Sequence, residues 1–150
     1  MSNLRRRWRP LVSASTLASL LALAAPTHAQ EPSMQIRLEL DDTTLTATLD
    51  DTPSTREFLA QLPMEQVLQD YAETEKISDL PRRLTTEGAP DGYTPRAGDL
   101  AYYAPWGNLA IFHRDFRFSR GLVRLGRLDG GVEALRQAGP LRVVIRRLEP

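Results

Sequence analysis

Aromatic and arginine side chains concentrate between residues 93 and 120. Beyond residue 29 the sequence holds nine Phe, Tyr and Trp residues, and seven of them lie in this window. Aromatic rings can wall a pocket for an apolar or proline-like ring, and arginines at its rim can hold a carbonyl or carboxylate group. We therefore predict a ligand-binding cleft formed by Tyr103, Trp106, Phe112, His113 and Arg114. Aromatic residues are also frequent in core strands, so core filling stays open as the alternative.

Other site chemistries find little support in the residue types present. The sequence has no cysteine, which excludes thiol catalysis, disulfides and thiolate metal sites. His113 is the one histidine beyond residue 29, so a histidine-based zinc or iron site is excluded as well. The acidic pairs at 41–42 and 50–51 stand at strand ends and lack the spacing of a calcium loop. We predict neither a metal nor a cofactor, whereas catalysis by paired carboxylates stays open because no spacing argues for it or against it.

The first 29 residues have the pattern of a cleavable export signal. Basic residues at 5–9 precede an apolar run at 11–25, and small residues occupy the positions before a cleavage site after Ala29. The apolar run has fifteen residues, short of the roughly 20 that cross a bilayer as a helix, which disfavours a retained membrane anchor. The sequence therefore predicts a periplasmic or secreted protein with no stable membrane insertion after cleavage. Arg9 and Pro10 favour ordinary secretion over the twin-arginine route.

Cleavage would leave a domain of 121 residues, numbered 30–150, which is enough for one hydrophobic core. All 19 acidic residues lie in this part of the chain, whereas four of the 19 basic residues lie in the leader. The mature domain therefore has 15 basic and 19 acidic residues, a net charge of −4 that argues against a nucleic-acid partner. A small ligand or a peptide segment is the expected partner.

Hydrophobic periodicity predicts a mainly β domain. Apolar residues alternate over 34–40 and over 45–49, with a turn of two or four residues between them, which is typical of a hairpin. Thr52 and Pro53 predict the start of a short helix that ends before Pro63, and a second short helix is predicted at 132–137, starting near Asp129. Residues 72–98 read as a long polar loop held against the domain by Ile77, Leu80 and Leu84. Further strands are predicted at 64–71, 100–104, 109–113, 122–128 and 141–148.

A series of short motifs runs through residues 34–148. They are Thr46-Ala47-Thr48-Leu49 with Pro53 and Phe58-Leu59, Asp70-Tyr71, Glu75-Lys76, Pro81, Leu84, Glu87-Gly88-Ala89-Pro90, Gly98-Asp99-Leu100-Ala101-Tyr102-Tyr103, Trp106-Gly107-Asn108-Leu109-Ala110 and Ser119-Arg120-Gly121-Leu122-Val123. In this order the motifs resemble the bacterial cyclophilin-like proteins. The resemblance implies a small closed cyclophilin-like β-barrel with two short helices, in a family whose activity is unassigned.

Three consecutive residues resemble a catalytic motif. True cyclophilins are prolyl isomerases with a catalytic arginine in a Phe-His-Arg motif, which Phe112-His113-Arg114 resembles. The segment 115–118 departs from the glutamine- and glycine-rich sequence of true cyclophilins, and the motif falls late in the chain, so we interpret the triplet as coincidence. The leading hypothesis is an exported domain of unassigned activity that binds a small ligand or peptide in the aromatic cleft. The alternatives are a periplasmic peptidyl-prolyl cis/trans isomerase with Arg114 as catalytic donor, and a structural partner of another envelope protein.

Overall fold

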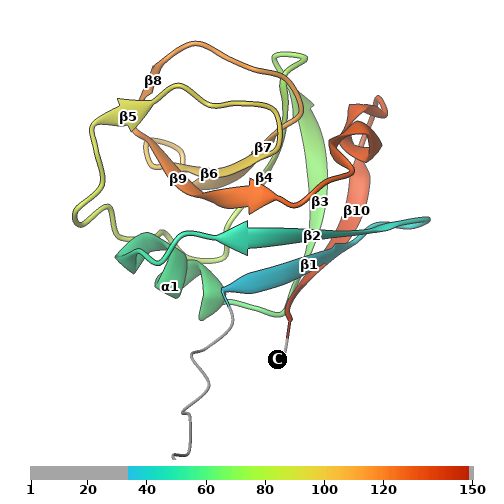
Figure 1. The fold of residues 1–150 in the computed structure, drawn as a ribbon, viewed down its shortest axis with the longest axis horizontal. Helices are drawn as coiled ribbons and strands as arrows, with labels where there is room; N and C mark the ends of the chain where they lie inside the picture. The colour runs from blue at the N-terminus through green and yellow to red at the C-terminus, as the bar shows by residue number, and fades with distance from the viewer. Residues whose placement is uncertain (1–33, 149–150) are drawn as a thin grey trace, which may run out of the picture. The chain divides into compact units, whose positions relative to one another are not determined.

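Eight antiparallel strands close into a barrel in the order β1-β10-β3-β4-β7-β6-β9-β2 (Figure 1). The computed structural model describes residues 34–148, so the predicted leader and its cleavage site lie outside the described residues. The predicted closed β-barrel is confirmed. The barrel strands are β1 (Gln35–Glu39), β2 (Thr44–Leu49), β3 (Met64–Tyr71), β4 (Glu75–Asp79), β6 (Asp99–Tyr103), β7 (Asn108–Phe112), β9 (Leu122–Leu128) and β10 (Leu141–Arg147).

The first two strands form the predicted hairpin, joined by a turn of four residues. Leu38 of β1 stands opposite Leu45 of β2, and both side chains are buried in the barrel core. The backbone N–H of Leu40 donates to the carbonyl of Thr43 across the turn. The two apolar faces therefore meet on the interior side, as the alternating pattern predicts.

Two short helical segments complete the fold. The helix α1 (Pro53–Leu59) begins at Thr52, whose hydroxyl accepts a hydrogen bond from the backbone N–H of Thr55, and it buries Phe58 completely. The second segment is a 3₁₀-helix, η1 (Val132–Arg136), which follows Gly131 in a left-handed conformation with φ of 73°. Asp129, predicted near its start, instead accepts hydrogen bonds from two hydroxyl groups on β2, those of Thr46 and Thr48.

The prediction of one continuous loop over 72–98 is wrong. Residues 75–79 form β4, a full member of the barrel that pairs with β3 and β7. Residues 92–93 form the short strand β5 (Gly92–Tyr93), which pairs with β8 (Ser119–Arg120) in a separate two-stranded ribbon. Of the three residues predicted to hold this region, Leu80 and Leu84 are buried, whereas Ile77 belongs to β4 and is partly buried.

The strand β4 escapes prediction because a charged side chain occupies one of its interior positions. Lys76, the only lysine in the sequence, is fully buried and stands opposite the core residue Ile111. Its ammonium donates to the carbonyls of Gln137 and Gly139, both at 2.7 Å, and forms an ion pair of 2.6 Å with Asp70. A lysine is almost never buried unless it is paired, so a lysine in the sequence does not indicate a core position.

The strands β6 and β7 are buried on both faces, as their continuous apolar runs predict. Their inward residues, such as Leu100 and Leu109, belong to the main core. Their outward residues Ala101, Ala110 and Phe112 form a second apolar cluster with Leu122. Because side chains alternate along a strand, Glu75 lies on this outward side of β4 while its neighbour Lys76 points into the barrel.

Candidate functional site

A cavity of about 400 Å³ opens over the second apolar cluster, on the outer side of β4, β6 and β7. We call it the aromatic pocket, because six of its lining side chains are Phe, Tyr or Trp. They come from strands, from the turn between β6 and β7, and from the segment that follows β7. The lining residues are Tyr71, Glu75, Tyr103, Trp106, Asn108, Phe112, Phe116, Arg117, Phe118, Ser119, Arg120 and Leu122.

The rings of the aromatic pocket hold one another in place by edge and face contacts. Trp106 meets Tyr71 edge-on with ring centroids 5.4 Å apart, and it meets Tyr103 in the same way at 5.3 Å. Phe112 and Phe116 stack at 6.4 Å. These are favourable geometries for aromatic pairs, so the walls are fixed before any ligand arrives.

The structure brings together three of the five predicted site residues. Tyr103, Trp106 and Phe112 line the aromatic pocket, whereas His113 and Arg114 do not. His113 is 5% exposed, and its buried Nδ1 has no hydrogen-bond partner among the described residues. Burial is the largest cause that lowers the pKa of His113, followed by the charge of Arg114, whose side chain is exposed. The strand β7 ends at Phe112, so the next residues leave the pocket wall.

Glu75 contributes a carboxyl group to the aromatic pocket that the sequence analysis missed. Burial raises the pKa of Glu75 to about 7, against the smaller lowering by the hydrogen bond from Thr74. That hydrogen bond joins Thr74 Oγ1 to Glu75 Oε2 at 3.3 Å. A carboxyl group that changes charge near neutral pH inside a cavity is typical of binding and catalytic sites. Only an assignment of β4 as a strand could have placed Glu75 opposite Phe112.

Asn108 lines the same cavity and has a side-chain oxygen without a donor among the described residues. Its side chain is 2% exposed, and its Nδ2 donates to the carbonyl of Leu109 at 3.0 Å. Its Oδ1 is buried and has no partner among residues 34–148. Buried polar atoms are nearly always hydrogen-bonded, so an acceptor of this kind invites a donor from outside the chain.

The arginines that line the aromatic pocket are Arg117 and Arg120, not the predicted Arg114. The guanidinium of Arg117 lies over the Phe116 ring, 4.7 Å from its centroid. Arg120 forms an exposed ion pair of 3.3 Å with Asp91. Both side chains belong to the segment after β7, where the aromatic residues Phe116 and Phe118 alternate with basic ones.

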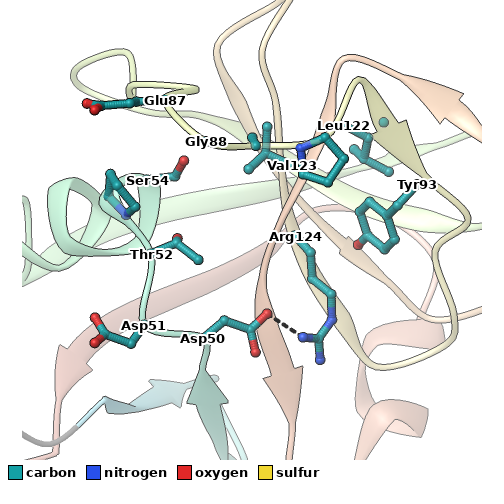
Figure 2. Close-up of a pocket in the computed structure, with 14 residues that line it drawn as sticks. Asp50, Asp51, Thr52, Ser54, Glu87, Gly88, Tyr93, Leu122, Val123 and Arg124 are labelled. Atoms are coloured by element: carbon teal, nitrogen blue, oxygen red, sulfur yellow. Dashed lines mark hydrogen bonds and ion pairs between the residues drawn. The ribbon is translucent and has the colours of Figure 1, made fainter.

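A second cavity of about 480 Å³ lies on the other side of the β5–β8 ribbon (Figure 2). Gly92 and Tyr93 of β5 line this cavity, whereas their partners Arg120 and Ser119 of β8 line the aromatic pocket. Leu122 lines both. We call it the proline-lined pocket after Pro53 and Pro90 in its wall; its other residues are Asp50, Asp51, Thr52, Ser54, Glu87, Gly88, Ala89, Val123 and Arg124.

Most polar groups of the proline-lined pocket already have partners within the protein. Asp50 is paired with Arg124, as the dashed line in Figure 2 marks, and Asp51 is paired with Arg56. The Ser54 hydroxyl donates to a backbone carbonyl. The Tyr93 hydroxyl is buried without a partner among the described residues, and burial raises its pKa. Each pocket therefore has one buried side-chain atom without a partner among the described residues, the Tyr93 hydroxyl oxygen here and Asn108 Oδ1 in the aromatic pocket.

Within residues 34–148, no group of three or more His, Asp or Glu side chains gathers closely enough to hold a metal ion. No helix within the same residues is both long enough and apolar enough to span a bilayer.

Comparisons with known proteins bear on the family and the fold. The sequence profile described as the Cyclophilin-like family matches residues 38–146. The solution structure of a hypothetical protein from Archaeoglobus fulgidus is similar to this chain with a TM-score of 0.58 and 18% sequence identity, over 80% of this chain and 99% of that one. At this identity the likeness concerns the fold alone. No curated protein matches the sequence.

Proposed function

This chain belongs to the Cyclophilin-like family, and from that premise we propose that it is a binding domain that takes a small ligand or a peptide segment in its aromatic pocket. Family membership supplies the barrel but no reaction, because one fold serves many unrelated functions. The proposal therefore depends on the site.

The observation that carries the proposal is the exposure of large rings around one cavity. Trp106 and Phe118 are each 54% exposed and Tyr71 is 42% exposed, and all three line the aromatic pocket. Leaving such rings in water forgoes stabilisation that burial would supply, at roughly 25 cal/mol for each Å². Exposed aromatic groups gathered at a concave site mark a surface that a ligand covers.

Binding can be tested through the fluorescence of Trp106. In a chain with Trp8→Phe, Trp106 is the only tryptophan, whether or not the leader is retained. Suitable probes are 2-phenylethanol, 2-phenylethylamine, phenylacetate and a proline-containing tetrapeptide. We expect at least one probe to change the Trp106 emission saturably, and Phe118→Ala to weaken that binding about tenfold because it removes one wall.

The matched control for Phe118→Ala is Val67→Ala. Val67 is 45% exposed and lies on β3 outside both pockets, so its loss leaves probe affinity unchanged. If all four probes leave the emission of Trp106 unaltered, the binding proposal is contradicted.

Prolyl isomerisation remains the alternative function, and its proposed donor is Arg114. The binding proposal is preferred because Arg114 and His113 do not line the cavity that contains Phe112. If the purified domain accelerates cis/trans exchange in a proline peptide and Arg114→Ala abolishes the effect, isomerisation replaces simple binding. Co-purification of a protein from the envelope fraction would support the third possibility, a structural partner.

We further propose that the domain acts outside the cytoplasm, after cleavage behind Ala29. The support is the leader pattern of residues 1–29. Mass spectrometry of the periplasmic or culture fraction should find a chain that begins at Gln30. Replacing Leu20 and Leu21 with arginine should keep the full-length chain inside the cell, whereas Val67→Arg, outside the leader, should not. A full-length chain recovered from the membrane would support a retained anchor instead.

A further inference from the structure

We propose that the aromatic pocket selects an organic cation, a ligand with a protonated amine on a small apolar body. This inference rests on the proposed function, because it names the chemistry of the ligand that the same pocket takes. It follows from the Glu75 carboxyl group in the pocket lining, from the rings around it, and from the contacts of the two arginines at its rim.

The carboxyl group of Glu75 is the acceptor that the pocket lining offers. It receives a hydrogen bond from the Thr74 hydroxyl and lies on the same outer face as Phe112. A protonated amine brings up to three N–H donors and a positive charge, so it can pair with this carboxylate.

The rings suit a cation in the same position. The faces of Trp, Tyr and Phe attract positive charge, most strongly for Trp. Arg117 already makes such a contact, since its guanidinium lies 4.7 Å from the centroid of Phe116. The pocket wall therefore stabilises positive charge in the structure itself, and Trp106, Tyr71 and Tyr103 provide further rings.

An anionic ligand is the competing possibility, because two arginines line the pocket. Arg120 is paired with Asp91, and Arg117 is engaged with a ring face. A carboxylate ligand would also bring its charge close to the carboxylate of Glu75. Like charges repel, and the repulsion is stronger at a half-buried carboxylate such as Glu75 than in bulk water, which disfavours the anion.

The charge of Glu75 makes the inferred binding depend on pH. Glu75 has a pKa of about 7, and a cation binds its ionised form, so lowering the pH from 8 to 6 protonates it and weakens binding about tenfold. The nearby titratable groups are His113, Lys76 and Asp70: burial lowers the pKa of His113, which directly follows β7, and Lys76 and Asp70 are paired with each other. The other ionisable side chains in the lining are Tyr71, Tyr103, Arg117 and Arg120.

The test compares three probes of nearly equal size: 2-phenylethylamine, which is a cation at these pH values, neutral 2-phenylethanol and anionic phenylacetate. Affinities are measured by Trp106 emission in the chain with Trp8→Phe. At pH 8 we expect the amine to bind at least tenfold more tightly than the alcohol, and phenylacetate to bind least. Glu75→Gln should remove this preference and its pH dependence.

The control variant is Glu133→Gln, since Glu133 is an exposed carboxylate on η1 that lines neither pocket. It should keep both the preference and the pH dependence. Thermal unfolding should find Glu75→Gln at least as stable as the parent at pH 8, because it removes a desolvated charge.

The outcomes separate the two proposals. If the alcohol or phenylacetate binds as tightly as the amine and Phe118→Ala weakens that binding, the cation inference fails and the binding function stands. The cation inference also fails, and the binding function stands, if Glu75→Gln leaves the preference for the amine intact. If none of the three probes affects Trp106, the cation inference fails, and the binding function fails with it when the proline tetrapeptide also leaves the emission unaltered.

Discussion

Replacing Lys76 with methionine is expected to lower the free energy of unfolding by about 3–5 kcal/mol. The ammonium of Lys76 holds two carbonyls of the segment 137–139 and the carboxylate of Asp70, all from inside the barrel. Methionine has a similar length but no donor, so the two carbonyls lose the buried donor that they share. Urea denaturation followed by circular dichroism measures the loss.

The matched control is Arg142→Met. Arg142 pairs with Glu65 across β10 and β3, but it is 70% exposed, so its loss should cost less than about 1 kcal/mol. A Lys76→Met protein within 1 kcal/mol of the parent would contradict the prediction.

The ion pair of Lys76 also has a pH signature. Its hydrogen bond is the largest cause that lowers the pKa of Asp70 below the ordinary value of 3.8. A carboxyl group whose pKa is lower in the folded state stabilises the fold above its ordinary pKa. That contribution is lost as the pH falls through the lowered pKa. Lys76→Met should therefore reduce the part of the acid-induced loss of stability that comes from Asp70.

Gly126→Ala is expected to destabilise the barrel by about 3 kcal/mol or more, at the upper end of overpacking effects. Gly126 lies where β9 meets β2, and a Cβ there would stand 2.4 Å from the Thr48 carbonyl oxygen and 2.6 Å from Leu49 Cα. Both atoms belong to the backbone and cannot rotate away. The β2–β9 pairing has three residue pairs in register, so a displacement of one strand threatens closure of the barrel.

Gly130→Ala is the control for Gly126→Ala. A Cβ at Gly130 meets nothing within 4 Å, so this change should alter stability by no more than about 0.5 kcal/mol. Thermal and urea unfolding of the two variants provides the comparison. Equal midpoints would show that the strands accommodate the methyl group and would refute the close-packing argument.

The barrel could be predicted from the sequence because seven of its strands carry uninterrupted apolar patterns. The eighth strand, β4, could not, because Lys76 and Ser78 occupy buried positions and Glu75 lies on the outer face. A buried lysine is acceptable only when the fold supplies its acceptors, and the carbonyls of Gln137 and Gly139 lie about 60 positions away in the chain. Local periodicity contains no information on such distant partners.

The aromatic half of the candidate site was predictable for a related reason. Tyr103, Trp106 and Phe112 are close in sequence and lie on two paired strands and their connecting turn. Glu75 reaches the same cavity only through the pairing of β4 with β7, which joins segments more than 30 residues apart. His113 and Arg114 follow Phe112 directly, but the end of β7 separates neighbours in sequence from neighbours in space.

The enclosure of Lys76 has a practical consequence for attaching labels to this protein. Apart from Lys76, every Lys or Arg position in the sequence is an arginine. Arginine does not react with acylating reagents directed at primary amines. With the sole lysine shut inside the barrel, the α-amino group at the start of the chain is the other primary amine available to such a reagent. A dye or surface tether coupled under native conditions would therefore attach at one defined point and leave the pocket chemically untouched.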